Sequence, residues 1–135
     1  MVVSLSITGL YTSLLALLFV GLAIKIIRLR LHFKAGIGDG GHQPLAKAIR
    51  IHGNFAEYIP MALIMLGIYE VNGASPIVLH ALGAILFIGR ILHAVGLSKT
   101  TGVSKQRQIG MLSLFLVMLI LAVENIRLFI GQLLT

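Results

Sequence analysis

The stretch SLSITGLYTSLLALLFVGLAIKII, residues 4–27, decides the fold of this chain. Lys25 is its one charged side chain, and about 20 consecutive apolar residues suffice for a helix to cross the hydrocarbon core of a bilayer. The stretch is longer than the apolar core of a signal peptide, and no basic residue precedes it. We therefore expect it to stay in the membrane as a spanning helix.

The composition of the whole chain agrees with a membrane location. Of its 135 residues, 58% are hydrophobic and 11% are charged, whereas soluble domains carry about 25% charged residues. We expect one integral membrane domain over residues 1–135. Cysteine is absent, which excludes disulfides, thiolate metal sites and a cysteine nucleophile. Any thiol chemistry therefore needs a thiol that arrives on a ligand.

Three further apolar segments follow, separated by loops rich in glycine or polar residues. The sequence predicts an all-α, four-helix membrane bundle with helices over residues 4–33, 44–71, 76–97 and 105–133. Pro60 falls inside the second segment, where we expect a kink or a loosened turn. Small residues at 83, 84, 89 and 110 are expected to let helices approach closely.

The charges of the loops predict the orientation. Lysine and arginine gather in and beside the first and third loops, and the second has none; the basic residues are Lys25, Arg28, Arg30, Lys34, Lys47 and Arg50 at the first loop, and Lys99, Lys105 and Arg107 at the third. Because basic loops stay on the cytoplasmic side, we expect residues 34–47 and 98–106 there and both termini on the opposite side.

Polar side chains form one stripe at the start of the second segment, RIHGNFAEYIP, residues 50–60. Each residue of a helix turns the side chain by about 100°, so Arg50, Asn54 and Glu57 share a face, with Tyr58 at its edge. His52 points to roughly the opposite side. The stripe offers a cation, an amide, a carboxylate and a phenol.

The other segments add cations near the same end. Arg90 and His93 share a face of the third segment, Arg107 opens the fourth, and Arg28 lies near the end of the first, with Arg30 turned away. The simplest alternatives are structural. Arg28 and Arg30 suit interfacial anchors, and Arg90 suits an ion pair with Glu57 that joins two helices. No histidine pair has the spacing of a metal site, so no metal is predicted.

Together these groups predict a polar pocket between helices, open to the cytoplasm and walled by apolar side chains. The net charge of +7 suits an anionic ligand or anionic membrane lipids, while no extramembrane domain for nucleic acid is evident. Such a pocket fits a ligand with several carboxylates together with a lipophilic small molecule. An arginine beside a ligand thiol favours the nucleophilic thiolate.

The chain resembles the MAPEG family, the membrane-associated proteins in eicosanoid and glutathione metabolism, and in particular its small bacterial members. The resemblance rests on IRLR (27–30), RIHGNFAEYIP (50–60), GRILHAVG (89–96) and KQRQIG (105–110). The second of these is similar to the family pattern R-x-H-x-N-x-x-E. The resemblance implies a homotrimer in the bacterial inner membrane, with glutathione bound between neighbouring subunits.

The resemblance also implies roles for single residues. Arg107 would activate the glutathione thiol, and the remaining set would bind glutathione: Arg28, Arg30, Arg50, Asn54, Glu57, Tyr58, Arg90 and His93. Leu97 stands where glutathione-using members often carry tyrosine.

Three functions stay open from the sequence. The first is a membrane-bound glutathione transferase or peroxidase that acts on lipophilic electrophiles or lipid hydroperoxides. The second is a non-catalytic membrane protein of the same fold that binds lipid or another ligand, and the absent tyrosine hydroxyl favours it. The third is a small proton-coupled exporter that uses Glu57.

Overall fold

The computed structural model describes residues 4–100 and 102–134. Its four helices are α1 (Ser6–Phe33), α2 (Gln43–Val71), α3 (Pro76–Lys99) and α4 (Lys105–Leu133). The predicted all-α four-helix fold is thus confirmed, and each helix is long and apolar enough to cross a membrane. The predicted helix ends differ from these bounds by two residues at most. α3 extends to Lys99, two residues past its predicted end, and α4 begins at Lys105, as predicted.

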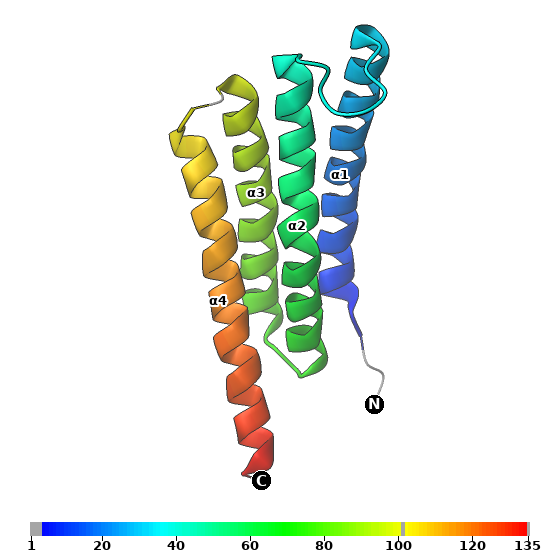
Figure 1. Ribbon diagram of the computed structural model, residues 1–135. Helices are drawn as coiled ribbons and strands as arrows, with labels where there is room; N and C mark the ends of the chain where they lie inside the picture. The colour runs from blue at the N-terminus through cyan, green and yellow to red at the C-terminus, as the bar shows by residue number, and fades with distance from the viewer. Residues whose placement is uncertain (1–3, 101, 135) are drawn as a thin grey trace.

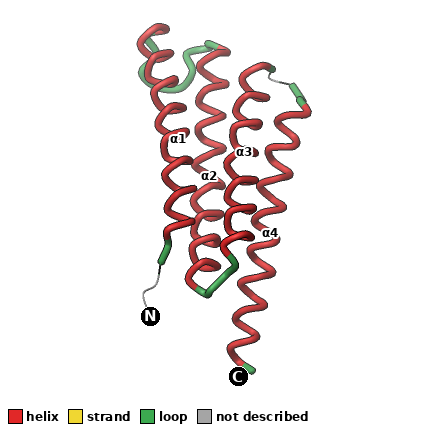
Figure 2. The backbone as a smooth tube through the Cα atoms, turned by 180° about the vertical axis from the view of Figure 1, so that it is seen from behind, coloured by secondary structure: helices red, strands yellow, loops and turns green. Residues whose placement is uncertain are grey.

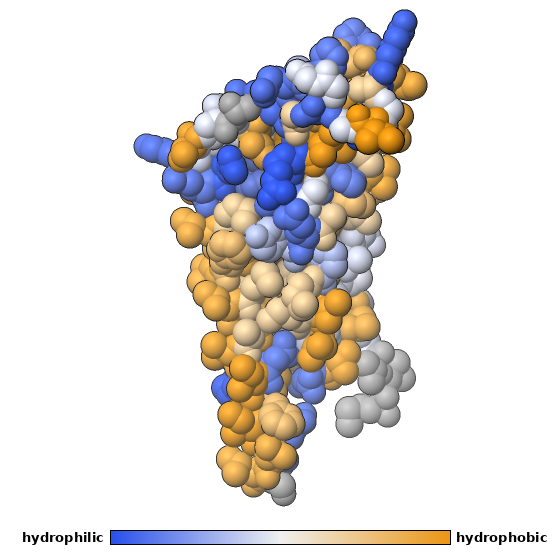
Figure 3. Space-filling model, viewed as in Figure 1, coloured by the Kyte–Doolittle hydropathy of each residue, from blue (hydrophilic) through white to orange (hydrophobic). Residues whose placement is uncertain are grey.

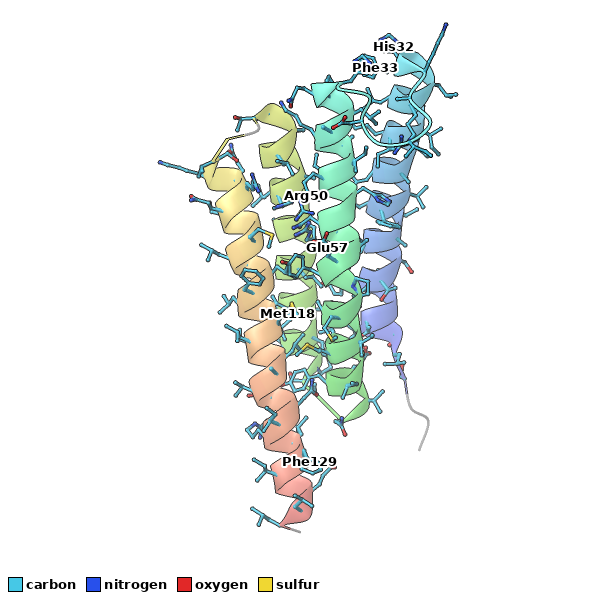
Figure 4. The ribbon with its side chains drawn as sticks, in the orientation of Figure 1. His32, Phe33, Arg50, Glu57, Met118 and Phe129 are labelled. Carbon is cyan, nitrogen blue, oxygen red and sulfur yellow. The ribbon has the colours of Figure 1, made fainter. Side chains whose placement is uncertain are left out.

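Each helix is antiparallel to the next in the chain (Figure 1). α2 also packs against α4, and α1 against α3, so the four helices form a bundle. The loops that join α1 to α2 and α3 to α4 lie at one end of the bundle, and the turn between α2 and α3 lies at the other (Figures 1 and 2). α4 continues past that turn, and Phe129 lies on the extension (Figure 4). The two predicted basic loops therefore share one end, as the predicted orientation requires.

Two apolar clusters fill the interior. One contains Leu15, Phe55 and Leu86, and the other contains Leu66 and Leu121 with their neighbours. Large apolar side chains also cover the outside, where a soluble protein would be polar. Figure 3 shows this apolar surface along the bundle, with hydrophilic side chains gathered toward the end that carries the two basic loops.

Glycines let α3 and α4 come close together. A Cβ added at Gly110 would lie 2.5 Å from the Gly89 carbonyl oxygen and 2.7 Å from the Cβ of His93. A Cβ added at Gly83 would overlap the ring of Tyr11 from α1. The predicted role of these three glycines in close helix approach is confirmed. Gly96, which the sequence did not single out, is as tightly placed, since a Cβ there would lie 2.6 Å from the Arg107 backbone nitrogen.

The start of α1 is capped by a residue from another helix. Leu5 at the N-cap position supplies no side-chain hydrogen bond, and the backbone N–H groups of Ile7 and Thr8 donate instead to the two carboxylate oxygens of Glu70, at 2.9 and 2.7 Å. The first N–H groups of a helix have no partner within the helix and carry a partial positive charge. Glu70, at the end of α2, therefore ties the two helices together.

Candidate functional site

Arg50 and Glu57 form an ion pair on the surface of α2. The Arg50 Nη1 atom lies 3.0 Å from the Glu57 Oε1 atom, and the two side chains remain 56% and 49% exposed. They lie two helical turns apart, so both side chains extend along the helix to meet (Figure 4). With Gly38 and Asp39 of the preceding loop they line an open hollow of 440 Å³. Two of the predicted site residues are thus accessible to a ligand at the loop end.

Arg30 holds the loop that forms the opposite wall of this hollow. Its Nη1 atom donates to the carbonyl oxygens of Ala35 and Gly38, at 3.1 and 2.9 Å. Lys34 ends α1 in the left-handed conformation, which turns the chain into the loop. Arg30 therefore supports the wall of the hollow that contains Gly38.

Asn54, Arg90 and His93 form a buried polar layer between α2 and α3. They are 6%, 2% and 1% exposed. The Arg90 Nη2 atom donates to the Asn54 side-chain oxygen at 2.7 Å and lies 3.3 Å from the His93 Nδ1 atom. The guanidinium also lies 5.9 Å from the centroid of the Phe55 ring. The alternative of an Arg90–Glu57 ion pair is wrong, because Arg90 pairs with Asn54 and Glu57 with Arg50.

Arg107 lies in the first turn of α4, and the Ser104 hydroxyl accepts its backbone N–H at 3.3 Å. The predicted thiol-activating residue therefore stands at a capped helix N-terminus. With Ser104, Gln108 and Met111 it lines a second hollow, of 280 Å³. The sulfur of Met111 lies 3.7 Å from the Arg90 Nη1 atom, so the Met111 side chain lies between this hollow and the buried layer.

Three helices contribute arginine side chains toward the loop end of the bundle. Arg50 lies on α2, Arg90 on α3 and Arg107 on α4. Arg28, on α1, is exposed and lies outside the contacts described above. Tyr58 is half-buried and meets the Phe115 ring of α4 edge-on, at 5.8 Å between centroids.

The helical phase of the stripe at residues 50–60 is confirmed in part. His52 points away from it and stacks on Phe19 of α1, with 4.3 Å between ring centroids. Asn54, in contrast, is turned inward while Arg50 and Glu57 face outward. The contacts of Met111 with Arg90 and of Ser104 with Arg107 were not predicted from the sequence. A serine just before a predicted helix was the available signal for the latter.

Metal ligands do not gather in the described part of the chain. Among residues 4–100 and 102–134, no three histidine, aspartate or glutamate side chains come together in a way that could hold a metal ion. The charged side chains that line the two hollows are Asp39, Arg50, Glu57 and Arg107.

Comparisons with known proteins place the chain among membrane proteins. Residues 8–127 match the family described as the MAPEG family. The chain is also similar to a protein named inner membrane protein YecN from Escherichia coli strain K12, and to the protein of the same name from an O6:H1 strain. Each is 35% identical over 120 residues, which cover 89% of this chain and 90% of the relative.

Proposed function

Because the chain belongs to the MAPEG family and is an integral inner-membrane protein, we propose that it is a glutathione-dependent membrane enzyme. It binds glutathione at the loop end of the bundle and activates the thiol at Arg107. The thiolate then attacks a lipophilic electrophile or a lipid hydroperoxide that enters from the bilayer.

The observation that carries this proposal is the exposed Arg50–Glu57 pair. An ion pair between exposed side chains contributes only about 0–1 kcal/mol, so a ligand separates it at little cost. Glutathione carries an ammonium group and carboxylates. Its ammonium group can take the place of Arg50 beside Glu57, and a carboxylate can take the place of Glu57 beside Arg50. Glu57 then accepts the ammonium, and Arg50 donates to a carboxylate as a bidentate fork. The 440 Å³ hollow beside the pair has room for the peptide.

The buried layer supports this wall. Arg90 and His93 hold Asn54 at a fixed depth below Arg50 and Glu57. The positive charge of Arg90 also favours an anionic ligand above it, since this charge is only weakly screened inside the bundle. Tyr58 and Arg28 are proposed to contact glutathione from the edge of the site and from α1.

Arg107 is suited to stabilise a thiolate. Its guanidinium stands at the N-terminus of α4, where the helix dipole adds partial positive charge.

In transfer, the thiolate sulfur forms a bond to the electrophilic carbon, and the leaving group departs with its electron pair. In peroxide reduction, the sulfur attacks the terminal oxygen and the O–O bond breaks. The alkoxide takes a proton to become an alcohol, and a second glutathione converts the sulfenic acid to the disulfide and water.

The proposed assembly is a homotrimer with the site between neighbouring subunits. The hollow beside Arg50 and the hollow beside Arg107 are separate and open in the described protomer. A neighbouring subunit that covers both would enclose the ligand and exclude water from the thiolate.

A non-catalytic ligand-binding protein is the second candidate, and Leu97 favours it. This side chain is 5% exposed, so the position where related enzymes often carry tyrosine supplies no hydroxyl to the site. The exporter hypothesis has less support, because Glu57 is held by Arg50 at 3.0 Å, and a paired carboxylate is a poor proton carrier.

The experiment compares Arg107→Ala with a matched loss of charge, Lys105→Ala, two residues earlier on the same helix. Each protein is purified in lipid nanodiscs. Glutathione binding is measured by calorimetry. Transferase activity is measured with an aryl halide, and peroxidase activity is measured with a lipid hydroperoxide. We expect Arg107→Ala to lower both activities at least about tenfold, and Lys105→Ala to leave them near wild type.

Two outcomes would overturn parts of the proposal. Equal activities in both variants and the wild type would remove Arg107 from the mechanism. Absence of binding at millimolar glutathione would favour the non-catalytic candidate. Cross-linking in nanodiscs tests the trimer separately.

A further inference from the structure

The buried Arg90 guanidinium is short of strong hydrogen-bond acceptors among the residues that the structure describes. A guanidinium carries five N–H groups. Its Nη2 atom donates to the Asn54 side-chain oxygen and lies beside the His93 ring, whereas its Nε atom has no partner among these residues. The Nη1 atom donates to the sulfur of Met111 at 3.7 Å. Because a thioether sulfur is a weak acceptor, this buried cation is incompletely satisfied.

Met111 lies where a small oxidant can reach its sulfur. The side chain is partly exposed and lines the open 280 Å³ hollow together with Arg107, beside the loop between α3 and α4. Met118 lies seven residues later, on the same side of α4, and packs against the same apolar cluster. It lies farther from the loop end, toward the middle of the bundle (Figure 4). Met118 is therefore the matched comparison for Met111.

Oxidation would turn the weak acceptor beside Arg90 into a strong one. The thioether sulfur attacks the terminal oxygen of a hydroperoxide, the O–O bond breaks, and the departing alkoxide takes a proton to become an alcohol. The product is methionine sulfoxide. Its oxygen is one bond away from a sulfur at 3.7 Å from Nη1, so it can lie within hydrogen-bond distance of that atom. The guanidinium charge also stabilises the negative charge that develops on the departing oxygen.

We propose that Met111 is a site of reversible oxidation by hydroperoxides, and that the sulfoxide oxygen accepts a hydrogen bond from the Arg90 Nη1 atom. The modification supplies an acceptor to the buried layer and joins α4 to α3 more firmly. It also places a polar oxygen at the inner edge of the hollow beside Arg107. Methionine sulfoxide reductases reverse this oxidation. The proposal needs a hydroperoxide and the two side chains, and it does not depend on glutathione.

The first experiment measures which methionine is oxidised. The protein in lipid nanodiscs is treated with hydrogen peroxide in the absence of glutathione, and the sulfoxide at each methionine is followed in time by peptide mass spectrometry. We expect Met111 to be oxidised at least about tenfold faster than Met118, because the hollow admits the oxidant and the neighbouring cation stabilises the transition state.

Glutamine substitutions test the new hydrogen bond without oxidation. A glutamine side chain carries a carbonyl oxygen close to the place of the sulfoxide oxygen. Met111→Gln should unfold in sodium dodecyl sulfate at a midpoint equal to or above that of the wild type, because Arg90 gains an acceptor. Met118→Gln should lower the midpoint, because it buries an amide among apolar side chains. In an Arg90→Met background, Met111→Gln should lower the midpoint as well.

Three outcomes would overturn the proposal. Oxidation of Met118 as fast as Met111 would remove the selectivity. Equal losses of stability in Met111→Gln and Met118→Gln would remove Arg90 as the partner of the new oxygen. The same conclusion would follow if Met111→Gln had equal effects with and without Arg90. Neither measurement contains glutathione, so these results are separate from the test of the proposed function.

Discussion

Replacing Asn54 by leucine tests the buried layer most directly. The substitution keeps the approximate volume of the side chain but removes the oxygen that accepts from Arg90 at 2.7 Å. A hydrogen bond to a charged group contributes about 1.5–3 kcal/mol, and a buried donor left without a partner adds a cost of about 1–3 kcal/mol. The Arg90 Nε atom already lacks a partner. We expect Asn54→Leu to lower the free energy of unfolding by about 3 kcal/mol.

The double variant with Arg90→Met makes this reasoning refutable. A methionine side chain needs no acceptor, so adding Arg90→Met to Asn54→Leu should restore stability instead of lowering it further. We expect the double variant to be about 2 kcal/mol more stable than the sum of the single effects predicts. The measurement is reversible unfolding by sodium dodecyl sulfate in mixed micelles, for the wild type, both single variants and the double variant.

The exposed pair supplies the control. The same cycle with Arg50→Met and Glu57→Leu should give a coupling below about 1 kcal/mol, because both side chains are near half exposed. Additive effects at Asn54 and Arg90, or equal couplings for the two pairs, would refute the distinction between a structural buried layer and an exchangeable surface pair.

Three further predictions follow from single contacts. Glu70→Gln removes the charge that caps α1 and should lower the free energy of unfolding by about 1 kcal/mol in the same assay. Gly110→Ala places a Cβ against the Gly89–His93 backbone and should cost more than about 2 kcal/mol, whereas Gly21→Ala, with open space around it, should be neutral or stabilising. The exchange Arg50→Glu with Glu57→Arg keeps an ion pair but reverses its polarity; thermal stability should stay near wild type while calorimetric glutathione affinity falls at least about tenfold.

Much of the fold could be predicted because the membrane limits the choices. A helix satisfies its own backbone in hydrocarbon, so four apolar segments of sufficient length already predict four helices. The proline and glycine positions then set the turns, as Gly73, with its positive φ of 84°, does after α2. The extension of α3 by two residues, to Lys99, was missed because residues 98 and 99 are polar, and polarity at a membrane interface does not end a helix.

Partners of the polar residues were harder to predict. Helical phase placed Arg50, Asn54 and Glu57 on one stripe, but phase alone does not say where a neighbouring helix covers that stripe. Arg90 could have reached Glu57 or Asn54, and the choice depends on how α3 packs on α2. That packing depends in turn on close approaches at glycines, such as Gly89, whose partners lie on another helix.

Within one helical turn of α2, one residue of the stripe therefore stabilises the fold and another is available for ligand binding. Asn54 and Glu57 are three residues apart, which rotates one side chain by about 60° from the other. That rotation is enough to turn Asn54 toward Arg90 in the interior and to leave Glu57 beside Arg50 at the surface. A buried polar layer with its charge partly satisfied resists rearrangement, because each change leaves an unpaired group. A surface pair exchanges partners freely. Substitutions at Asn54 should thus change mainly the free energy of unfolding, whereas substitutions at Glu57 should change mainly the ligand affinity.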